Sequence, residues 1–131
     1  MRIRIVVCDD ETHIARAVSM KLRKAGFDVE TACDGQLALE AIQREVPSLL
    51  VTDCQMPRMS GIELCRQLRD QPVTERLPVI LLTAKAYELE HETLKSQLRL
   101  SHILHKPFSP RELLSLVRET LDVTCERTQP A

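Results

Sequence analysis

Five short apolar segments, separated by longer amphipathic stretches, constrain the fold of this chain more than any other feature of its sequence. Residues 3–8, 49–52 and 79–82 are almost entirely apolar and rich in Val, Ile and Leu. Segments that are apolar on both faces are typical of central strands in a parallel sheet that helices cover on each side. Residues 28–32 and 102–105 are more polar, which favours strands at the edges of that sheet.

The stretches between these segments carry helical periodicity and recognisable helix ends. The apolar stripes are Ile14, Val18, Leu22 and Ala25; Leu37, Ala38, Ala41 and Ile42; Leu64 and Leu68; Tyr87, His91, Leu94 and Leu98; and Leu113, Leu116, Val117 and Leu121. Capping residues, capping boxes and a stop signal mark the ends of these expected helices. These boundary residues are Gly26, Asp34, Pro47, Ser60 with Glu63, and Ser109 with Glu112.

The alternation of strand and helix repeats five times over residues 3–122. Parallel strands need right-handed helical crossovers, so this order predicts an open, doubly wound α/β sheet of five strands. A chain of 131 residues with 44% apolar residues has room for one such domain. We expect the domain at residues 1–122, followed by a short C-terminal tail at 123–131.

Composition and charge favour a soluble, cytoplasmic protein. The first residues lack the apolar region of a signal peptide, and no apolar run approaches the roughly 20 residues of a membrane span. Five cysteines without a C-x-x-C pair suit a reducing compartment. Eighteen basic and nineteen acidic residues nearly cancel, and only three residues are aromatic. We therefore expect no direct binding to nucleic acid or to a membrane.

Polar side chains follow four of the expected strands at their carboxyl ends, where ligands bind to open parallel sheets. Three neighbouring carboxylates repel one another, and a divalent cation with hard oxygen ligands, Mg²⁺ or Mn²⁺, resolves this. Each residue alone fits an ordinary helix-start acid, a strand-end hydroxyl or a surface lysine. Their joint placement favours a site. The residues are Asp9 and Asp10 after the first strand, Asp53 after the third, Thr83 and Ala84 after the fourth, and Lys106 after the fifth.

At these positions the sequence resembles the receiver domains of two-component response regulators over nearly the whole chain. The resemblance rests on the D-x-x-M-P-x-x-x-G stretch from Asp53 to Gly61, and on Asp9-Asp10, Thr83-Ala84 and Lys106-Pro107-Phe108. It implies a flavodoxin-like fold with strand order 2-1-3-4-5.

The resemblance also implies the chemistry of the site. Asp53 would accept a phosphoryl group from a sensor histidine kinase, a histidine phosphotransfer protein or a small phosphodonor. Asp10 and Asp53 would hold Mg²⁺, with Asp9 acting largely through water and the Gln55 backbone carbonyl completing the protein ligands. Lys106 would place a positive charge against the phosphoryl oxygens.

Further positions are expected to shape the pocket around this chemistry. The resemblance implies that Thr83 binds the phosphoryl group and moves its loop inward, that Ala84 leaves room for access, and that Pro107 follows a cis peptide bond. Gln55 and Lys85 are expected at the rim of the pocket, where such positions tune phosphoryl lifetime.

Two departures from the family lie on its usual output face. Ile103 stands where most receivers carry an aromatic switch residue, and Arg99-Leu100 replaces a Gly-Ala turn. We expect the signal to move the Thr83 loop without an aromatic switch.

The remaining reactive side chains receive structural interpretations. His102 and His105 are three residues apart on an expected strand, so they lie on opposite faces and fit one metal poorly. Cys54 stands beside Asp53 without an activating base, which favours a packing role.

The leading hypothesis is a stand-alone switch that assists its own phosphorylation and dephosphorylation but is not an enzyme in the usual sense. Its output would pass to a separate partner protein, a phosphorelay is a version of the same reading, and a homodimer is compatible with it. The alternative is a degenerate receiver that docks constitutively. A flavin-binding module fits poorly, because Asp9-Asp10-Glu11 would repel its phosphate. A magnesium phosphatase would carry a second aspartate where this chain has Gln55.

Overall fold

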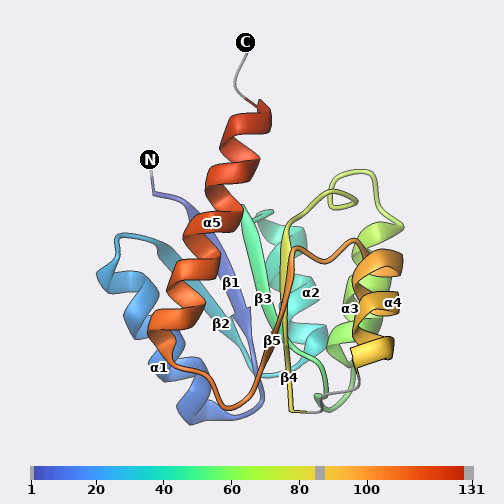
Figure 1. Cartoon of the computed structure of the whole chain (residues 1–131), viewed down its shortest axis with the longest axis horizontal. Helices are drawn as coiled ribbons and strands as arrows, with labels where there is room; N and C mark the ends of the chain where they lie inside the picture. The colour runs from blue at the N-terminus through green and yellow to red at the C-terminus, as the bar shows by residue number, and fades with distance from the viewer. Residues whose placement is uncertain (1, 85–87, 129–131) are drawn as a thin grey trace.

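The computed structural model describes residues 2–84 and 88–128, with side chains for these residues except 88–91 and 123–128. It is a three-layer α/β fold in which helices cover both faces of a central sheet (Figure 1). The elements in chain order are β1 (Arg4–Cys8), α1 (Thr12–Lys24), β2 (Asp28–Ala32), α2 (Gly35–Arg44), β3 (Leu49–Asp53), α3 (Gly61–Arg69), β4 (Val79–Thr83), α4 (Glu88–Leu98), β5 (His102–His105) and α5 (Pro110–Thr128).

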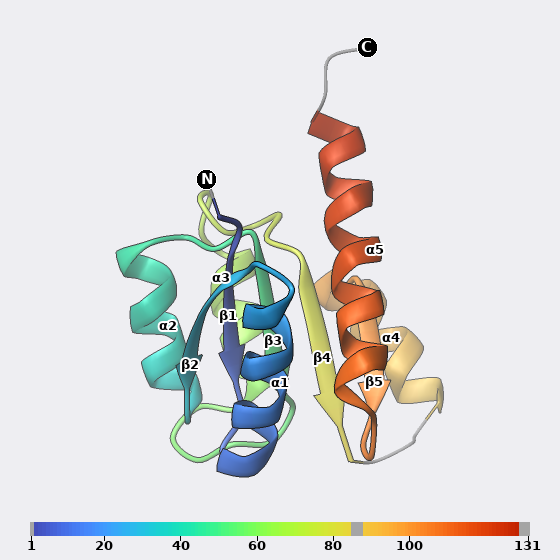
Figure 2. The ribbon, with the colours of Figure 1, turned by 90° about the vertical axis from the view of Figure 1, so that its left-hand side faces the viewer.

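The five strands form one parallel sheet in the order β2-β1-β3-β4-β5, which confirms the predicted fold class and strand order. Asp53 at the end of β3 pairs with Leu82 of β4, and Thr83 at the end of β4 pairs with His105 of β5. The strands run toward the lower edge of the molecule in Figure 2, and the two termini lie at the opposite edge. The polar residues after the strands are therefore gathered along one edge.

Alternate residues of the strands pack against two different sets of helices. One cluster lies between the sheet and helices α2, α3 and α4, and the other lies between the sheet and helices α1 and α5. The first includes Val6, Leu50, Leu81, Ile42, Leu64, Leu68 and Leu98; the second includes Ile5, Val51, Leu82, Val18, Leu22, Leu113 and Val117. The residues of β1, β3 and β4 that carry the clusters are at most 1% exposed, so these strands are central, as predicted.

The predicted helix boundaries are confirmed at four positions. The Asp34 side chain accepts a hydrogen bond from the Leu37 amide at the start of α2. Ser60 Oγ accepts a hydrogen bond from the Glu63 amide at the start of α3. At the start of α5 Ser109 and Glu112 form a reciprocal capping box. Gly26 follows α1 with φ +100°, the left-handed conformation that suits a glycine after a helix.

Two of the predicted apolar stripes are shifted around their helices. In α2 Leu37 is exposed and Leu39 is buried instead. Leu37 and Leu39 flank the same stripe, and the one that is buried depends on how the helix rolls against the sheet. In α1 Ala15 and Ser19 are buried beside Val18, whereas the predicted Ile14 and Ala25 are only half-buried. Tyr87 and the side chain of His91 lie outside the described residues.

Helix α5 continues to Thr128, so residues 123–128 of the expected tail continue the helix. The boundary between domain and tail at residue 122 stays a prediction.

The C-terminal end of α4 is held by an arginine from α3. Arg69 donates hydrogen bonds to the carbonyl oxygens of Leu98 at 2.7 Å and Arg99 at 3.3 Å, and also to that of Thr74 at 3.1 Å. Arg99 has φ +53°, although it is not a glycine. The turn that replaces the family's Gly-Ala therefore keeps the left-handed backbone that a glycine would supply.

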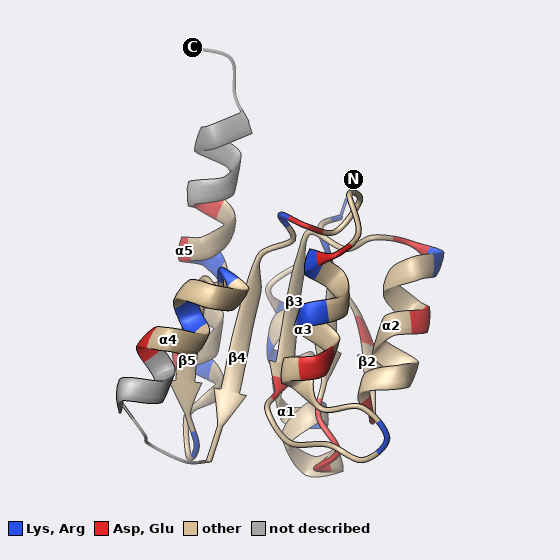
Figure 3. Ribbon diagram, turned by 90° about the vertical axis from the view of Figure 1, so that its right-hand side faces the viewer, with Lys and Arg blue, Asp and Glu red and all other residues tan. Residues whose placement is uncertain are grey.

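Charges of both signs are mixed on the helices that face the viewer in Figure 3. This mixture is in keeping with the near-cancellation of charge in the sequence. Within the described part of the chain, no helix combines the length and the apolar character that a membrane crossing requires.

Candidate functional site

Three carboxylates meet at the carboxyl edge of the sheet. Asp9 and Asp10 directly follow β1, and Asp53 is the last residue of β3. Each offers a carboxylate oxygen, and these three oxygens lie within 4.8 Å of one another. Asp9 and Asp53 are buried, whereas Asp10 is exposed, so the cluster opens to solvent on the Asp10 side.

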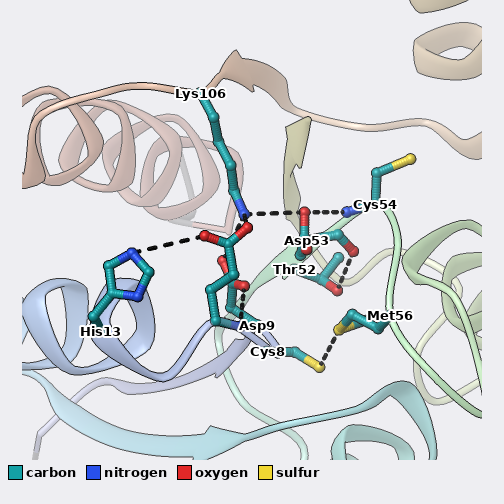
Figure 4. Close-up of polar contacts among 9 residues, drawn as sticks. Cys8, Asp9, His13, Thr52, Asp53, Cys54, Met56 and Lys106 are labelled. Carbon is teal, nitrogen blue, oxygen red and sulfur yellow. Dashed lines mark hydrogen bonds and ion pairs between the residues drawn. The ribbon is translucent and has the colours of Figure 1, made fainter. Parts of the chain in front are cut away.

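Lys106 reaches into this cluster from the loop after β5 (Figure 4). Its Nζ lies 3.1 Å from Asp9 Oδ2, 3.4 Å from Asp53 Oδ1 and 3.3 Å from Glu11 Oε1. The peptide bond between Lys106 and Pro107 is cis, as the resemblance implied. One ammonium group thus joins the ends of β1, β3 and β5.

Burial and mutual repulsion destabilise the charged forms of the two buried carboxylates. Burial is the main cause that raises the pKa of Asp53 to about 6, and the charge of Asp9 adds to it. Lys106 and the Cys54 amide partly offset this rise. Burial also raises the pKa of Asp9, against hydrogen bonds from the Glu11 amide and Lys106. Two carboxyl groups held this way favour a bound cation, because a cation stabilises their ionised forms.

The charge on Lys106 is stabilised by the same groups. Burial alone would lower the pKa of its ammonium group. The hydrogen bond and the charge of Asp9 raise this pKa, and so do the charge of Asp53 and the hydrogen bond to Glu11. Together they outweigh burial, so the pKa of Lys106 is raised. Lys106 is therefore a permanent positive charge at this site across the neutral pH range.

The oxygen ligands fit a hard divalent cation such as Mg²⁺. Asp9 Oδ2 is buried and lies 3.1 Å from the Lys106 ammonium, and no neutral donor satisfies it among the described residues. The Asp53 Oδ1 atom accepts a hydrogen bond from the Cys54 amide at 2.9 Å, which fixes the orientation of that carboxylate. Asp9, Asp10 and Asp53 would hold the ion, and an all-oxygen set with an exposed side suits a cation that keeps several waters.

The other predicted site residues lie at or near this edge. Thr83 is buried at the end of β4, and Ala84 is exposed directly after it. Gln55 is exposed in the loop after Asp53, where the contribution of its backbone carbonyl stays a prediction. Ile103 in β5 is half-buried and packs against the cluster beneath α2, α3 and α4. Lys85 lies outside the described residues.

Two glycines allow the loop after β3 to pass close to its neighbours. A Cβ atom on Gly61 would clash with the carbonyl oxygen of Asp53, and one on Gly35 would clash with that of Met59. The Gly61 amide donates to the Cys54 carbonyl at 3.0 Å and closes the base of the loop. Burial raises the pKa of the Cys54 thiol, and this side chain packs against the core, in agreement with a packing role.

Sequence reasoning missed Glu11 as a member of the site. Its carboxylate pairs with Lys106 and lines a pocket of about 500 Å³ between α1 and the start of α5, together with His13, Ala84 and Phe108. The run Asp9-Asp10-Glu11 was the signal that could have identified it. Glu11 also precedes α1 as its N-cap residue, but its side chain makes no cap hydrogen bond and meets Lys106 instead.

Comparison with known proteins agrees with this geometry. Residues 5–118 match the response regulator receiver domain. The chain is 40% identical over 121 residues to the alkaline phosphatase synthesis transcriptional regulatory protein PhoP of Bacillus subtilis, which covers 92% of this chain and 49% of that protein. It is 39% identical over 118 residues to the phosphate regulon transcriptional regulatory protein PhoB of Rhizobium meliloti, covering 90% of this chain and 52% of that protein. The chain thus spans about half the length of these relatives.

Solved structures show the same fold. The chemotaxis response regulator CheY4 of Vibrio cholerae superposes with a TM-score of 0.84 at 30% identity, covering 92% of this chain and 99% of that one. A CheY-like receiver domain protein of Methanospirillum hungatei superposes with a TM-score of 0.88 at 28% identity, covering 97% of this chain and 99% of that one. With the matched residues, the acidic cluster and Lys106 together, the chain belongs to the response regulator receiver domain family.

Proposed function

We propose that this receiver domain is a phosphorylation-dependent signalling switch in which Asp53 is the phosphoacceptor. The observation that supports this most directly is that Asp53 lies within reach of both the Asp9-Asp10 pair and the Lys106 ammonium group. Its pKa of about 6 leaves the carboxylate ionised near neutral pH, as a nucleophile must be. The proposed receiver unit spans residues 1–122.

The reaction needs positioning and charge neutralisation more than covalent help from the protein. An Asp53 carboxylate oxygen attacks the phosphorus atom and forms the acyl phosphate as the bond from phosphorus to the donor breaks. With a phosphohistidine donor, the imidazole nitrogen keeps the electron pair of that bond. Lys106, 3.4 Å from Asp53 Oδ1, stabilises the negative charge on the transferring phosphoryl oxygens.

Mg²⁺ held by Asp9, Asp10 and Asp53, with the Gln55 carbonyl, would neutralise phosphoryl charge when bound. Asp10 is exposed and offers its oxygen from the solvent side, whereas Asp9 is fixed by the Glu11 amide at 2.9 Å. This difference supports a direct contact from Asp10 and a contact through water from Asp9. A receiver of this kind is a phosphoacceptor rather than a classical enzyme, and it turns over only its own phosphoryl group.

The pairing of β4 with β5 supports a route for the signal from Asp53 to the output face. Thr83 would bind the phosphoryl group, and the exposed, small Ala84 leaves the donor access to Asp53. Thr83 pairs with His105, and Leu81 pairs with Ile103 in the same ladder. A movement at Thr83 therefore reaches Ile103 through the strand pair, without an aromatic side chain. Lys85 and Gln55 would adjust the phosphoryl lifetime at the rim.

The proposed partners follow from this chemistry. A sensor histidine kinase or a histidine phosphotransfer protein would supply the phosphoryl group, and a separate protein would recognise the phosphorylated form. The pocket lined by Glu11, His13 and Phe108 lies beside Lys106, so a donor protein that reaches Asp53 would approach along it.

The test is the intact mass of the chain after incubation with acetyl phosphate and Mg²⁺, with Asp53→Asn treated in parallel. The proposal predicts the gain of one phosphoryl group in the wild type and none in the variant. Nuclear magnetic resonance spectra of the phosphorylated chain should then show changes from Thr83 to Ile103. No gain of mass, under conditions where Mg²⁺ is shown to bind, would support the constitutive docking module instead.

A further inference from the structure

The loop between β3 and α3 is attached at its far end to the turn before α2. Arg58 Nη2 lies 3.1 Å from Asp34 Oδ2. One residue further on, the Met59 carbonyl oxygen accepts a hydrogen bond from the Gly35 amide at 3.2 Å. Two neighbouring loop residues are thus bound to two neighbouring residues of another element.

The Asp34 carboxylate is buried, and each of its two oxygens has a partner. The Asp34 side chain is 4% exposed, and its Oδ1 atom accepts a hydrogen bond from the Leu37 amide at the start of α2. Its Oδ2 atom meets Arg58. Removal of the guanidinium group would leave a buried carboxylate oxygen without its cation, so breaking this pair costs more than breaking one between two exposed side chains.

Cys8 provides a further connection between the turn before α2 and the loop after β3. The Cys8 thiol, buried at the end of β1, lies 3.2 Å from the Asp34 carbonyl oxygen and 3.1 Å from Met56 Sδ (Figure 4 shows the sulfur contact). Burial raises the pKa of this thiol to about 12, so it stays protonated and can donate its one hydrogen to either of these two acceptors.

Gln55 lies between these contacts and the base of the loop. At the base, the Cys54 amide donates to the Leu82 carbonyl at 2.8 Å. At the far side, Met56 is the first residue held against Cys8. The Gln55 side chain is exposed, so its backbone is oriented by the residues on either side rather than by its own packing.

We infer that Asp34 and Arg58 are positioning residues that hold the 54–60 loop so that the Gln55 carbonyl faces the Asp9-Asp10-Asp53 cluster, and that they thereby set the affinity for Mg²⁺. The inference rests on the proposed function for the metal ligands. Arg58 makes this contact from a left-handed backbone with φ +66°, a conformation that costs a non-glycine residue conformational free energy.

The experiment measures Mg²⁺ affinity by calorimetry and exchange of the Gly35 amide by nuclear magnetic resonance, both without phosphodonor. Arg58→Gln removes the cation, and Asp34→Asn removes the charge while it keeps a good helix cap. We expect each to weaken Mg²⁺ binding by about three- to tenfold, below the range for groups that contact a ligand directly. Gly35 exchange should speed up, because its acceptor Met59 is no longer held.

Three further variants separate positioning from general stability. The Asp34→Asn/Arg58→Gln double variant should bind Mg²⁺ no more weakly than either single variant, since both remove one interaction. Arg58→Lys keeps the charge and should recover most of the affinity. Arg44→Gln is the matched control, because Arg44 pairs with Glu30 at 2.7 Å and its side chain is 66% exposed, as is that of Arg58. It should bind Mg²⁺ as the wild type does.

Wild-type Mg²⁺ affinity in Arg58→Gln would overturn the inference, with or without faster Gly35 exchange. Equal losses in Arg44→Gln would also overturn it. The proposed function is decided separately by the mass of the phosphorylated wild type. A wild-type chain that binds Mg²⁺ but gains no phosphoryl group would contradict the proposed function. The effect of the variants on Mg²⁺ affinity could still be interpreted in that case. A wild-type chain that binds no Mg²⁺ would end both.

Discussion

The ammonium nitrogen of Lys106 lies 3.4 Å from Asp53 Oδ1, so the proposed nucleophile has a fixed cation beside it before any donor arrives. This cation lowers the pKa of Asp53, against the burial and the Asp9 charge that raise it. Lys106 therefore acts twice in the proposed reaction, on the ionisation of the nucleophile and on the charge of the phosphoryl group.

Replacement of Lys106 should slow phosphorylation of the chain. In Lys106→Gln the negative charge on the transferring group loses its nearest cation, and we expect a rate about 100-fold lower, in the range found for loss of one electrostatic contact. Lys106→Arg should lie between this variant and the wild type. The measurement is phosphorylation rate by intact mass at fixed acetyl phosphate and Mg²⁺. A Lys106→Gln rate equal to wild type would contradict the proposed contact with the phosphoryl group.

Replacement of Asp53 should stabilise the metal-free fold near neutral pH. The pKa of Asp53 is raised from 3.8 to about 6, so its contribution to stability is present below pH 4 and lost as pH rises through 6. Asp53→Asn removes this penalty and should raise the free energy of unfolding by about 1–3 kcal/mol at pH 8.

The measurement is urea denaturation from pH 4 to pH 8 in the presence of a chelator. The gain in Asp53→Asn should shrink toward pH 4, where Asp53 in the folded wild type is protonated and uncharged. Asp28→Asn, at an exposed position of β2, serves as the control and should show little change. A gain that does not vary with pH would rule out ionisation of Asp53 as its source.

Loss of the close approach at Gly61 should destabilise the fold and the site together. Gly61→Ala places a methyl group against the Asp53 carbonyl oxygen, and we expect a loss of about 3 kcal/mol in unfolding free energy. Gly26→Ala, where nothing lies within 4 Å, should lose only about 1 kcal/mol from its left-handed backbone. Thermal or urea denaturation compares the two. Equal losses would show that the loop moves aside to admit the methyl group, so that the contact with Asp53 costs little.

Restoration of glycine at residue 99 should stabilise the chain. Arg99 has φ +53°, and Arg99→Gly relieves that strain while the backbone carbonyl still accepts from Arg69. We expect a gain of about 0.5–1 kcal/mol in unfolding free energy, because the greater freedom of glycine in the unfolded chain offsets part of the relief. Urea denaturation gives the value, and a loss of stability would show that the Arg99 side chain makes contacts that outweigh the strain.

The fold and the acidic cluster could be predicted from the sequence because both depend on short-range signals. Apolar strands, helix caps and the residues directly after each strand are local, and a parallel sheet brings those residues to one edge. Asp9, Asp53 and Lys106 were found in this way. Which of Leu37 and Leu39 is buried was not predictable, since both positions border the same stripe.

The contact between Asp34 and Arg58 could not be predicted for a different reason. The two residues are 24 positions apart, and their meeting depends on the left-handed backbone of Arg58 and on the close approach of Gly35 to Met59. Asp34 carries a local signal as a helix cap, but that signal says nothing about its second carboxylate oxygen. Glu11 was missed because an acidic residue at this position is equally typical of the ordinary start of a helix such as α1.

The hydrogen bonds of Arg69 have a mechanical consequence for α4. They hold the last turn of this helix to α3 and to the turn at Arg99, whereas its first turn follows the segment after Thr83. Of the two ends of α4, the C-terminal one is therefore the end that these hydrogen bonds hold in place. If phosphorylation moves Thr83 as proposed, we expect α4 to swing about its held end rather than to slide, with the smallest displacement at Leu98.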